Sequence, residues 1–211
     1  MRLTTATVGP LTTASATSIV ATTGGSTAAG TAFTLTTSPY VMDKPRRVLI
    51  TSAGTDTSVI FSVVGTDWNG TPVSELLTGG SSGSPVYSLY DYSTVTSVTP
   101  TVNATAGTNS VGTNGIASTR PIFLDEYAFA QTSLQVSVTG SVIATVRQSL
   151  QDPNRVGYVN VTWLPHPDSN LVNLAASVQG NYAYMPKVVQ LVLNSGTGSA
   201  ELAVIQAAME P

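Results

Sequence analysis

The chain contains no cysteine, and only 9% of its 211 residues are charged. Without cysteine there can be no disulfide, no thiolate metal site and no cysteine nucleophile. Eight basic residues and a net charge of −3 are too little positive charge to neutralise the phosphates of a nucleic acid, so we expect no nucleic-acid partner. No apolar run has the length of a membrane span, so we expect no membrane partner.

Histidine occurs only once, at His166. A Ser-His-Asp triad needs an imidazole oriented by a carboxylate, with a serine in reach. Asp168 lies two residues away, and Gly79–Gly83 matches Gly-X-Ser-X-Gly by its letters, but a nucleophile elbow must open a helix and Pro85 follows here instead. One histidine cannot build a metal site. We therefore interpret His166 as a loop-packing residue and expect no cofactor and no metal.

Carboxylates are few, and none of them forms a recognisable pair. The candidate catalytic carboxylates are Asp67, Glu75, Asp91 and Asp125-Glu126. A glycosidase needs two carboxylates held across a sugar, and Asp91, inside the tyrosine-rich Tyr87–Tyr92, comes nearest to such a site. Aromatic residues mixed with small polar ones are more typical of cross-strand packing or of an interface. We expect that the chain is not an enzyme.

What the chain has instead is abundant Thr, Ser, Gly and Val. An average soluble domain has about 25% charged residues, and charge keeps monomers apart in solution. Two interpretations of a surface with so little charge remain. Either hydroxyl groups solvate it, or other subunits cover much of it. The second favours a homo-oligomer or a subunit of a larger assembly.

One strand-turn-strand pattern occurs twice. Arg46–Ser52 and Ser58–Gly65 are β-branched runs around a polar turn, which is typical of a hairpin. Lys187–Asn194 and Ala200–Gln206 repeat the pattern near the end of the chain. The repeat predicts two β domains, each with one such hairpin in its core.

The sequence predicts an all-β protein with very little helix. We expect two small antiparallel β-sandwich domains, Ig-like or jelly-roll-like, over residues 36–119 and 120–211. Residues 1–35 are dominated by Thr, Ala, Ser and Gly and form a Thr/Ser-rich N-terminal arm. This arm is either a flexible tail or an extended segment that pairs with the sheet edge of a neighbouring subunit.

Three local signals are sharper. Asn69-Gly70 predicts a tight turn that leads into a strand over Pro72–Leu77. Leu134–Gly140 alternates apolar and polar residues and predicts a half-buried strand. Gln151–Asn154 contains Asp-Pro and predicts a break after a second strand.

Several of these segments resemble a recurrent pattern in virion structural proteins of tailed bacteriophages. The resemblance covers most of the chain after the arm and consists of turn chemistry rather than of catalytic motifs. The segments that carry it are Ile50–Ser58, Phe61–Gly70, Glu75–Gly79, Thr94–Val98, Gln151–Asn154, Leu193–Gly198 and Val204–Gln206.

The resemblance implies a non-enzymatic component of a virion. A capsid decoration or cement protein, bound to the major capsid protein or to other virion proteins, is the first expectation. A head-to-tail connector or tail structural protein is an alternative, as is the carbohydrate-binding module of a fibre. From residue type alone, the expected interface anchors are Trp68, Tyr87, Tyr90, Tyr92 and Trp163.

Overall fold

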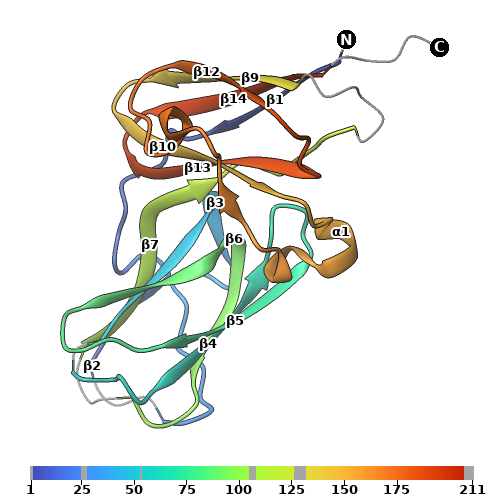
Figure 1. Cartoon of the computed structure of the whole chain (residues 1–211). Coiled ribbons are helices and arrows are strands. Elements are labelled where there is room, and N and C mark those ends of the chain that lie inside the picture. The colour runs from blue at the N-terminus through green and yellow to red at the C-terminus, as the bar shows by residue number, and fades with distance from the viewer. Residues whose placement is uncertain (1, 25–27, 53, 105–107, 126–131, 207–211) are drawn as a thin grey trace. The chain divides into compact units, whose positions relative to one another are not determined.

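The computed structural model describes residues 2–24, 28–52, 54–104, 108–125 and 132–206. Strands account for 55% of the chain and helices for 5%, and the strands pair antiparallel. The prediction of an all-β fold is therefore confirmed (Figure 1). In the described part of the chain, no helix is long and apolar enough to cross a membrane.

The strands are β1 (Arg2–Val8), β2 (Val20–Gly24), β3 (Tyr40–Thr51), β4 (Ile60–Thr66), β5 (Pro72–Thr78), β6 (Pro85–Pro100), β7 (Thr108–Ser118), β8 (Ile122–Phe123), β9 (Thr132–Thr139), β10 (Val142–Ser149), β11 (Leu164–Pro165), β12 (Val178–Tyr182), β13 (Val188–Gly196) and β14 (Ser199–Gln206).

The only α-helix in the described residues is α1 (Pro153–Val156). Asp152 caps it, accepting a hydrogen bond from the backbone N–H of Asn154 at 2.9 Å, as short polar side chains do at helix starts. This confirms the predicted break after β10. Two 3₁₀ helices follow, η1 (Tyr158–Asn160) and η2 (Ser169–Leu171).

The chain divides into two compact units, but not at the predicted boundaries 35/36 and 119/120. Met1–Thr12 and Ile116–Pro211 form one, called here the discontinuous unit, and Thr13–Gly115 form the other, called the continuous unit. The predicted arm, residues 1–35, is thus split. Strand β1 pairs with β14 and belongs to the discontinuous unit, whereas β2 pairs with β7 and belongs to the continuous unit.

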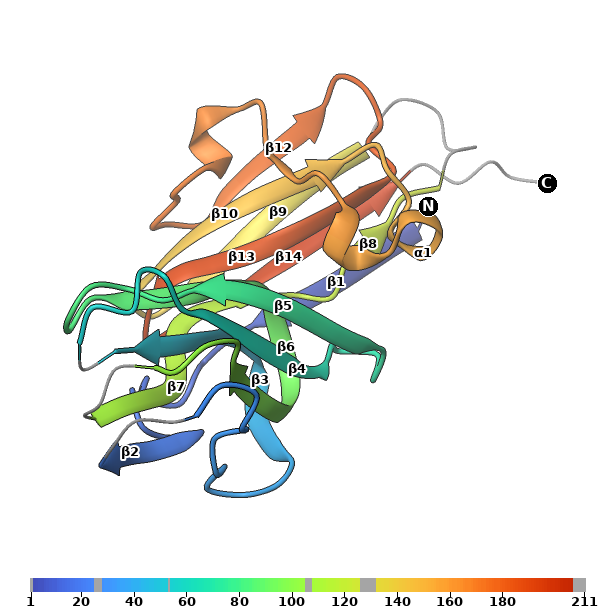
Figure 2. The ribbon, with the colours of Figure 1, turned by 90° about the horizontal axis from the view of Figure 1, so that it is seen from below.

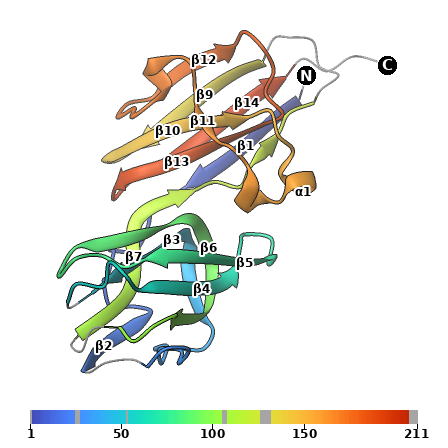
Figure 3. The same ribbon diagram turned by 60° about the horizontal axis from the view of Figure 1, so that its bottom comes forward.

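The discontinuous unit is a β-sandwich. One sheet has the order β1-β14-β9-β12 (Figure 3), and it packs on the strands β10 and β13. Strand β9 buries alternate residues, as predicted. The core contains Leu134, Val136, Val146, Leu191, Leu193, Leu202 and Val204.

The predicted hairpin of β13 and β14 is wrong, because the two strands lie in different sheets. β13 pairs with β10, whereas β14 pairs with β9 and β1. Likewise, β9 and β10 follow each other in sequence but lie in opposite sheets. The β9–β10 turn and the β13–β14 turn contact each other, since a Cβ on Gly140 would lie 3.2 Å from the Cα of Gly198. Each of these turns passes from one sheet to the other, so the apolar faces of the two sheets meet in one core.

The continuous unit contains a sheet of the order β7-β3-β6-β4-β5. The predicted hairpin of β3 and β4 is therefore also wrong, because β6 lies between them. The first half of β6 pairs with β3, where Arg47 is opposite Asp91. Its second half pairs with β4, where Val63 is opposite Val98.

The predicted turn at Asn69-Gly70 is confirmed, with β4 and β5 side by side (Figure 2). Asp67 Oδ1 accepts hydrogen bonds from the backbone N–H groups of Asn69 (2.7 Å) and Thr71 (2.9 Å). Gly70 has a φ of 78°, which glycine adopts without steric cost. Aspartate and glycine together fix this turn.

Candidate functional site

The five predicted interface aromatics do not form one site. Trp163 belongs to the discontinuous unit and the other four belong to the continuous unit. Tyr87 is 44% exposed, and Trp68, Tyr90 and Trp163 are half-buried. Tyr92 is fully buried, with its hydroxyl 3.4 Å from the carbonyl of Val63. Its assignment as an interface anchor is therefore wrong, since its side chain lies in the core.

Trp163 covers a polar cluster of its own unit. Its ring lies 5.9 Å from the ring of Tyr158, and the guanidinium carbon of Arg147 lies 4.7 Å from its centroid. A cation over an indole face at this distance is an attractive contact. Trp163 thus has an intramolecular packing role.

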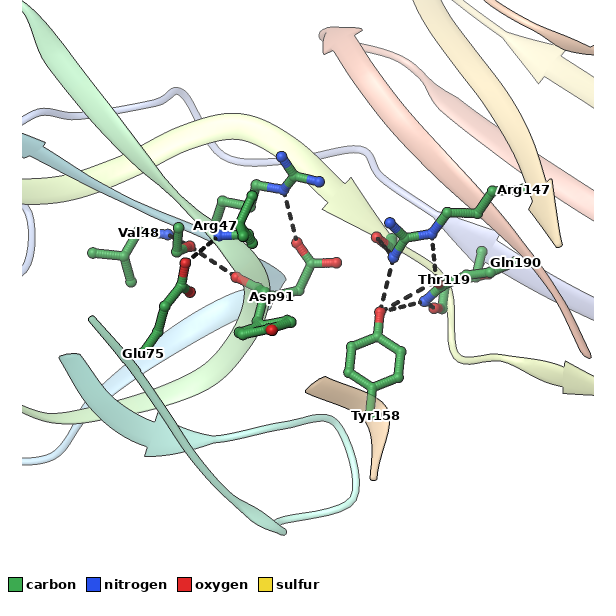
Figure 4. Close-up of polar contacts among 12 residues, drawn as sticks. Arg47, Val48, Glu75, Asp91, Thr119, Arg147, Tyr158 and Gln190 are labelled. Atoms are coloured by element: carbon green, nitrogen blue, oxygen red, sulfur yellow. Dashed lines mark hydrogen bonds and ion pairs between the residues drawn. The ribbon is translucent and has the colours of Figure 1, made fainter. Parts of the chain in front are cut away.

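The centre of this cluster is Gln190, which has no exposed surface. Its Oε1 accepts a hydrogen bond from Arg147 Nε at 2.8 Å, and its Nε2 donates to the Tyr158 hydroxyl and to the carbonyl of Thr119. The hydroxyl of Tyr158 also accepts from Arg147 Nη2 at 2.9 Å. We call Thr119, Arg147, Tyr158 and Gln190 the Gln190 cluster (Figure 4). It joins β10, β13, η1 and the segment after β7.

A second cluster lies in the continuous unit (Figure 4). Glu75 on β5 is 8% exposed, and its Oε1 accepts a hydrogen bond from the backbone N–H of Leu89 at 2.7 Å. Its Oε2 is buried without a hydrogen-bond partner among the described residues. Arg47 Nε lies 3.9 Å from Asp91 Oδ1. The bond from Leu89 to Glu75 therefore attaches β5 to the first half of β6, where β6 does not pair with β4.

Burial raises the pKa of Glu75 above its ordinary value of 4.5. The amide groups of Leu89 and Tyr90 and the charge of Arg47 oppose this rise, and the charge of Asp91 adds to it. Burial dominates because the Glu75 carboxylate loses more hydration free energy than the two amides and the Arg47 guanidinium return. Glu75 and Asp91 were candidate catalytic carboxylates, and the structure uses both in contacts that hold strands together.

Replacing Glu75 by glutamine is expected to flatten the pH dependence of stability. The native protein binds the Glu75 proton at higher pH than the unfolded chain does, so this group lowers the free energy of unfolding as pH rises above 4.5. Thermal unfolding of both proteins between pH 4 and pH 7 measures the difference. Glu75→Gln should gain stability relative to the parent with rising pH, and a constant difference would contradict the assignment.

Glu75→Ala is the matched control. It leaves the Leu89 N–H without its acceptor, which costs about 1–3 kcal/mol, and it should be destabilised at every pH.

The interpretation of His166 as a loop-packing residue is confirmed. It is 4% exposed, and its ring centroid lies 4.5 Å from that of Tyr182. Its Nδ1 accepts a hydrogen bond from the backbone N–H of Asp168, and the Asp168 carboxylate caps Asn170 instead of orienting the imidazole. Burial lowers the pKa of His166. Ser81, the serine of the Gly79–Gly83 match, belongs to the other unit.

Within the described ranges, no group of three His, Cys, Asp or Glu residues could hold a metal ion. Glu126, the second member of the Asp125-Glu126 pair, lies outside those ranges. Comparison of the chain with protein-family models, with curated proteins and with solved structures finds no match.

Two buried residues escaped prediction from the sequence. Gln190 is a single polar residue in an apolar run, and this interruption was the only sequence signal that a buried polar side chain lies there. Arg46 is fully buried, 3.2 Å from Asp43 and within 3.0 Å of the Thr113 hydroxyl. In the sequence it belonged only to a short basic cluster, Lys44 to Arg47, and nothing there distinguished a buried arginine from an exposed one.

Proposed function

We propose that this chain is a non-enzymatic structural subunit of a tailed-bacteriophage virion, and specifically a capsid decoration or cement protein. The observation that carries the role of a structural subunit is a surface with many exposed apolar side chains and few charges. The side chains that are between 57% and 70% exposed are Leu3, Val41, Leu76, Leu89, Leu150 and Leu164.

Such a surface favours association. Single exposed leucines are ordinary on soluble proteins, but here only 9% of the residues are charged, so little electrostatic repulsion opposes contact between subunits. Full burial of each such side chain stabilises a contact by about 1.5–3 kcal/mol. Three of the six lie in each unit, so both units have apolar surface for neighbours to cover, as in a protein that joins shell subunits.

Open strand edges supply a second kind of contact. In the described part of the chain, β1 and β12 end one sheet and β5 ends the sheet of the continuous unit. An unpaired edge can accept a strand from another chain through main-chain hydrogen bonds. Such contacts place few demands on side chains, which suits a chain rich in Thr and Ser.

The virion assignment rests on the resemblance in turn chemistry, of which the Asp67-capped turn between β4 and β5 is one instance. The carbohydrate-binding alternative needs exposed aromatic residues beside carboxylates or amides, for which the sequence offers Tyr90-Asp91-Tyr92 and Trp68-Asn69. Asp91 is 3% exposed and Tyr92 is fully buried, so they cannot present a carboxylate and an aromatic face to a sugar. Trp68-Asn69 in the β4–β5 turn remains available to that alternative.

Quantitative mass spectrometry of gradient-purified virus particles tests the proposal. A decoration protein should sediment with the particles in amounts comparable to the major shell protein. A few copies per particle would assign the chain to the connector, tail or fibre. Recovery only in the soluble fraction would overturn the virion function.

A further inference from the structure

We propose that β1 is an exchangeable strand, and that two copies of this chain associate by each placing its β1 on the β14 edge of the other. This proposal concerns the chain itself and does not depend on the identity of the particle.

The position of β1 in the fold is the first observation. The discontinuous unit takes Met1–Thr12, which contains β1, from the start of the chain and everything else from Ile116 onward. The whole continuous unit, Thr13–Gly115, lies between them in sequence. In sequence, β1 is therefore connected to the rest of its unit only through the continuous unit, and the rest of its unit, from Ile116 onward, is continuous.

The way in which β1 is held is the second observation. It makes an unbroken antiparallel ladder with β14, from Arg2 opposite Gln206 to Val8 opposite Ala200. Val8 is its only buried side chain, and Leu3 is 58% exposed. Its attachment is thus mainly main-chain hydrogen bonding, which an identical strand from a second copy reproduces in full.

The acceptor edge is the third observation. On its other side β14 pairs with β9, and its Leu202 and Val204 lie in the core. Without β1, the edge of β14 next to these core residues would be open. The sequence of β1 contains neither proline nor lysine, and its only charged residue is Arg2 at the start, so it lacks the usual protection against pairing with another chain.

The tether is the fourth observation. The crossing segment is held on the continuous unit at Ser15, whose carbonyl accepts a hydrogen bond from the Thr113 N–H at 2.9 Å. Gly9 is buried and Leu11 packs against the core of the discontinuous unit, so both move with β1 in an exchange. Residues 12–14 are exposed and form the hinge. Extended, these three residues span about 10 Å, so exchange requires a neighbouring molecule in direct contact.

Closed and exchanged forms therefore contain the same ladder and the same core contacts. The balance between them is set by the tether and by the local concentration of a second copy, the usual condition for strand exchange. The surface with few charges, described above, lets copies approach each other closely. Exchange would thus increase wherever copies are held side by side.

The absence of cysteine allows a direct test. Thr5 is opposite Ala203 in the ladder, and opposite residues of antiparallel strands have Cα atoms about 4.5–5.5 Å apart, which suits a disulfide. A Thr5→Cys protein and a size-tagged Ala203→Cys protein are mixed, unfolded in denaturant, refolded together and oxidised. Exchange predicts a disulfide-linked heterodimer on a non-reducing gel.

The control pairs Thr5→Cys with Ser74→Cys, an exposed residue on β5, and measures random collision. We expect at least about tenfold more heterodimer for the Thr5–Ala203 pair, because a docked strand holds its thiol at a high effective concentration. Equal yields for the two pairs would overturn the proposal. The double variant Thr5→Cys/Ala203→Cys provides a second readout, since the closed form links its two cysteines within one chain and the exchanged form links two chains. Its fraction of linked oligomers should exceed that of Thr5→Cys/Ser74→Cys and should rise with protein concentration. Particle mass spectrometry tests the proposed function separately.

Discussion

Gly112→Ala is expected to lower the free energy of unfolding by about 3 kcal/mol, a strong overpacking effect. A Cβ on Gly112 would lie 1.9 Å from the carbonyl oxygen of Ser15 and 2.5 Å from the carbonyl carbon of Ala16. Both atoms belong to the backbone, so no side-chain rotation relieves the clash. The next residue, Thr113, holds the same segment through its N–H and its hydroxyl. The segment must therefore move away from β7 and lose these bonds.

The matched control is Gly115→Ala on the same strand. No atom lies within 4 Å of a Cβ placed there, and its φ is not in the left-handed region. We expect Gly115→Ala to change the free energy of unfolding by less than about 1 kcal/mol, with a small gain from the reduced entropy of the unfolded chain. Urea titrations followed by circular dichroism compare the two. Similar effects from both variants would show that the crossing segment does not pack on β7.

The fold class follows from local signals that act within a few residues. Asn69-Gly70 forces a tight turn wherever the strands go, and Asp152 with Pro153 ends β10 through its own capping chemistry. Alternation in Leu134–Thr139 reports which side chains face a core. Each of these features is decided by neighbouring residues, so the sequence was sufficient to predict it.

Strand partners were not predictable in the same way. The residues of Arg46–Gly65 predict two strands, and they would be the same whether these strands pair with each other or with β6 between them. The residues that decide the pairing are those of β6, which begins only at Pro85. Likewise, nothing in Lys187–Gln206 states that the turn passes from one sheet to the other. The Thr-rich start of the chain resembled an arm because its partner, β14, lies at the opposite end of the sequence.

The same limit applies to the predicted anchors. Residue type identified Tyr90, Asp91 and Tyr92 as surface candidates, and strict alternation would expose at least one of the last two. Asp91 and Tyr92 are both buried, because the pairing of β6 with β3 shifts register on both sides of Arg46 and Arg47. A β-bulge changes which side chains face inward, and no motif in this stretch reveals it.

Gln190→Ala is expected to lower the free energy of unfolding by about 3–5 kcal/mol, from a cavity together with unpaired polar groups. The substitution removes the acceptor of Arg147 Nε and the donor to the carbonyl of Thr119. It also removes both contacts of the amide with the Tyr158 hydroxyl. Because the side chain has no exposed surface, water cannot replace these bonds without opening the sandwich.

Two comparisons separate the polar contribution from that of lost volume. Gln190→Leu fills most of the space and should recover part of the loss, and the remainder measures the hydrogen bonds. Gln179→Ala removes an exposed glutamine whose amide donates to Gln135 at 3.1 Å, and it should cost less than about 0.5 kcal/mol. If Gln190→Ala were as mild as Gln179→Ala, the Gln190 cluster would not be holding β10, β13 and η1 together, and Tyr158→Phe should then be neutral as well.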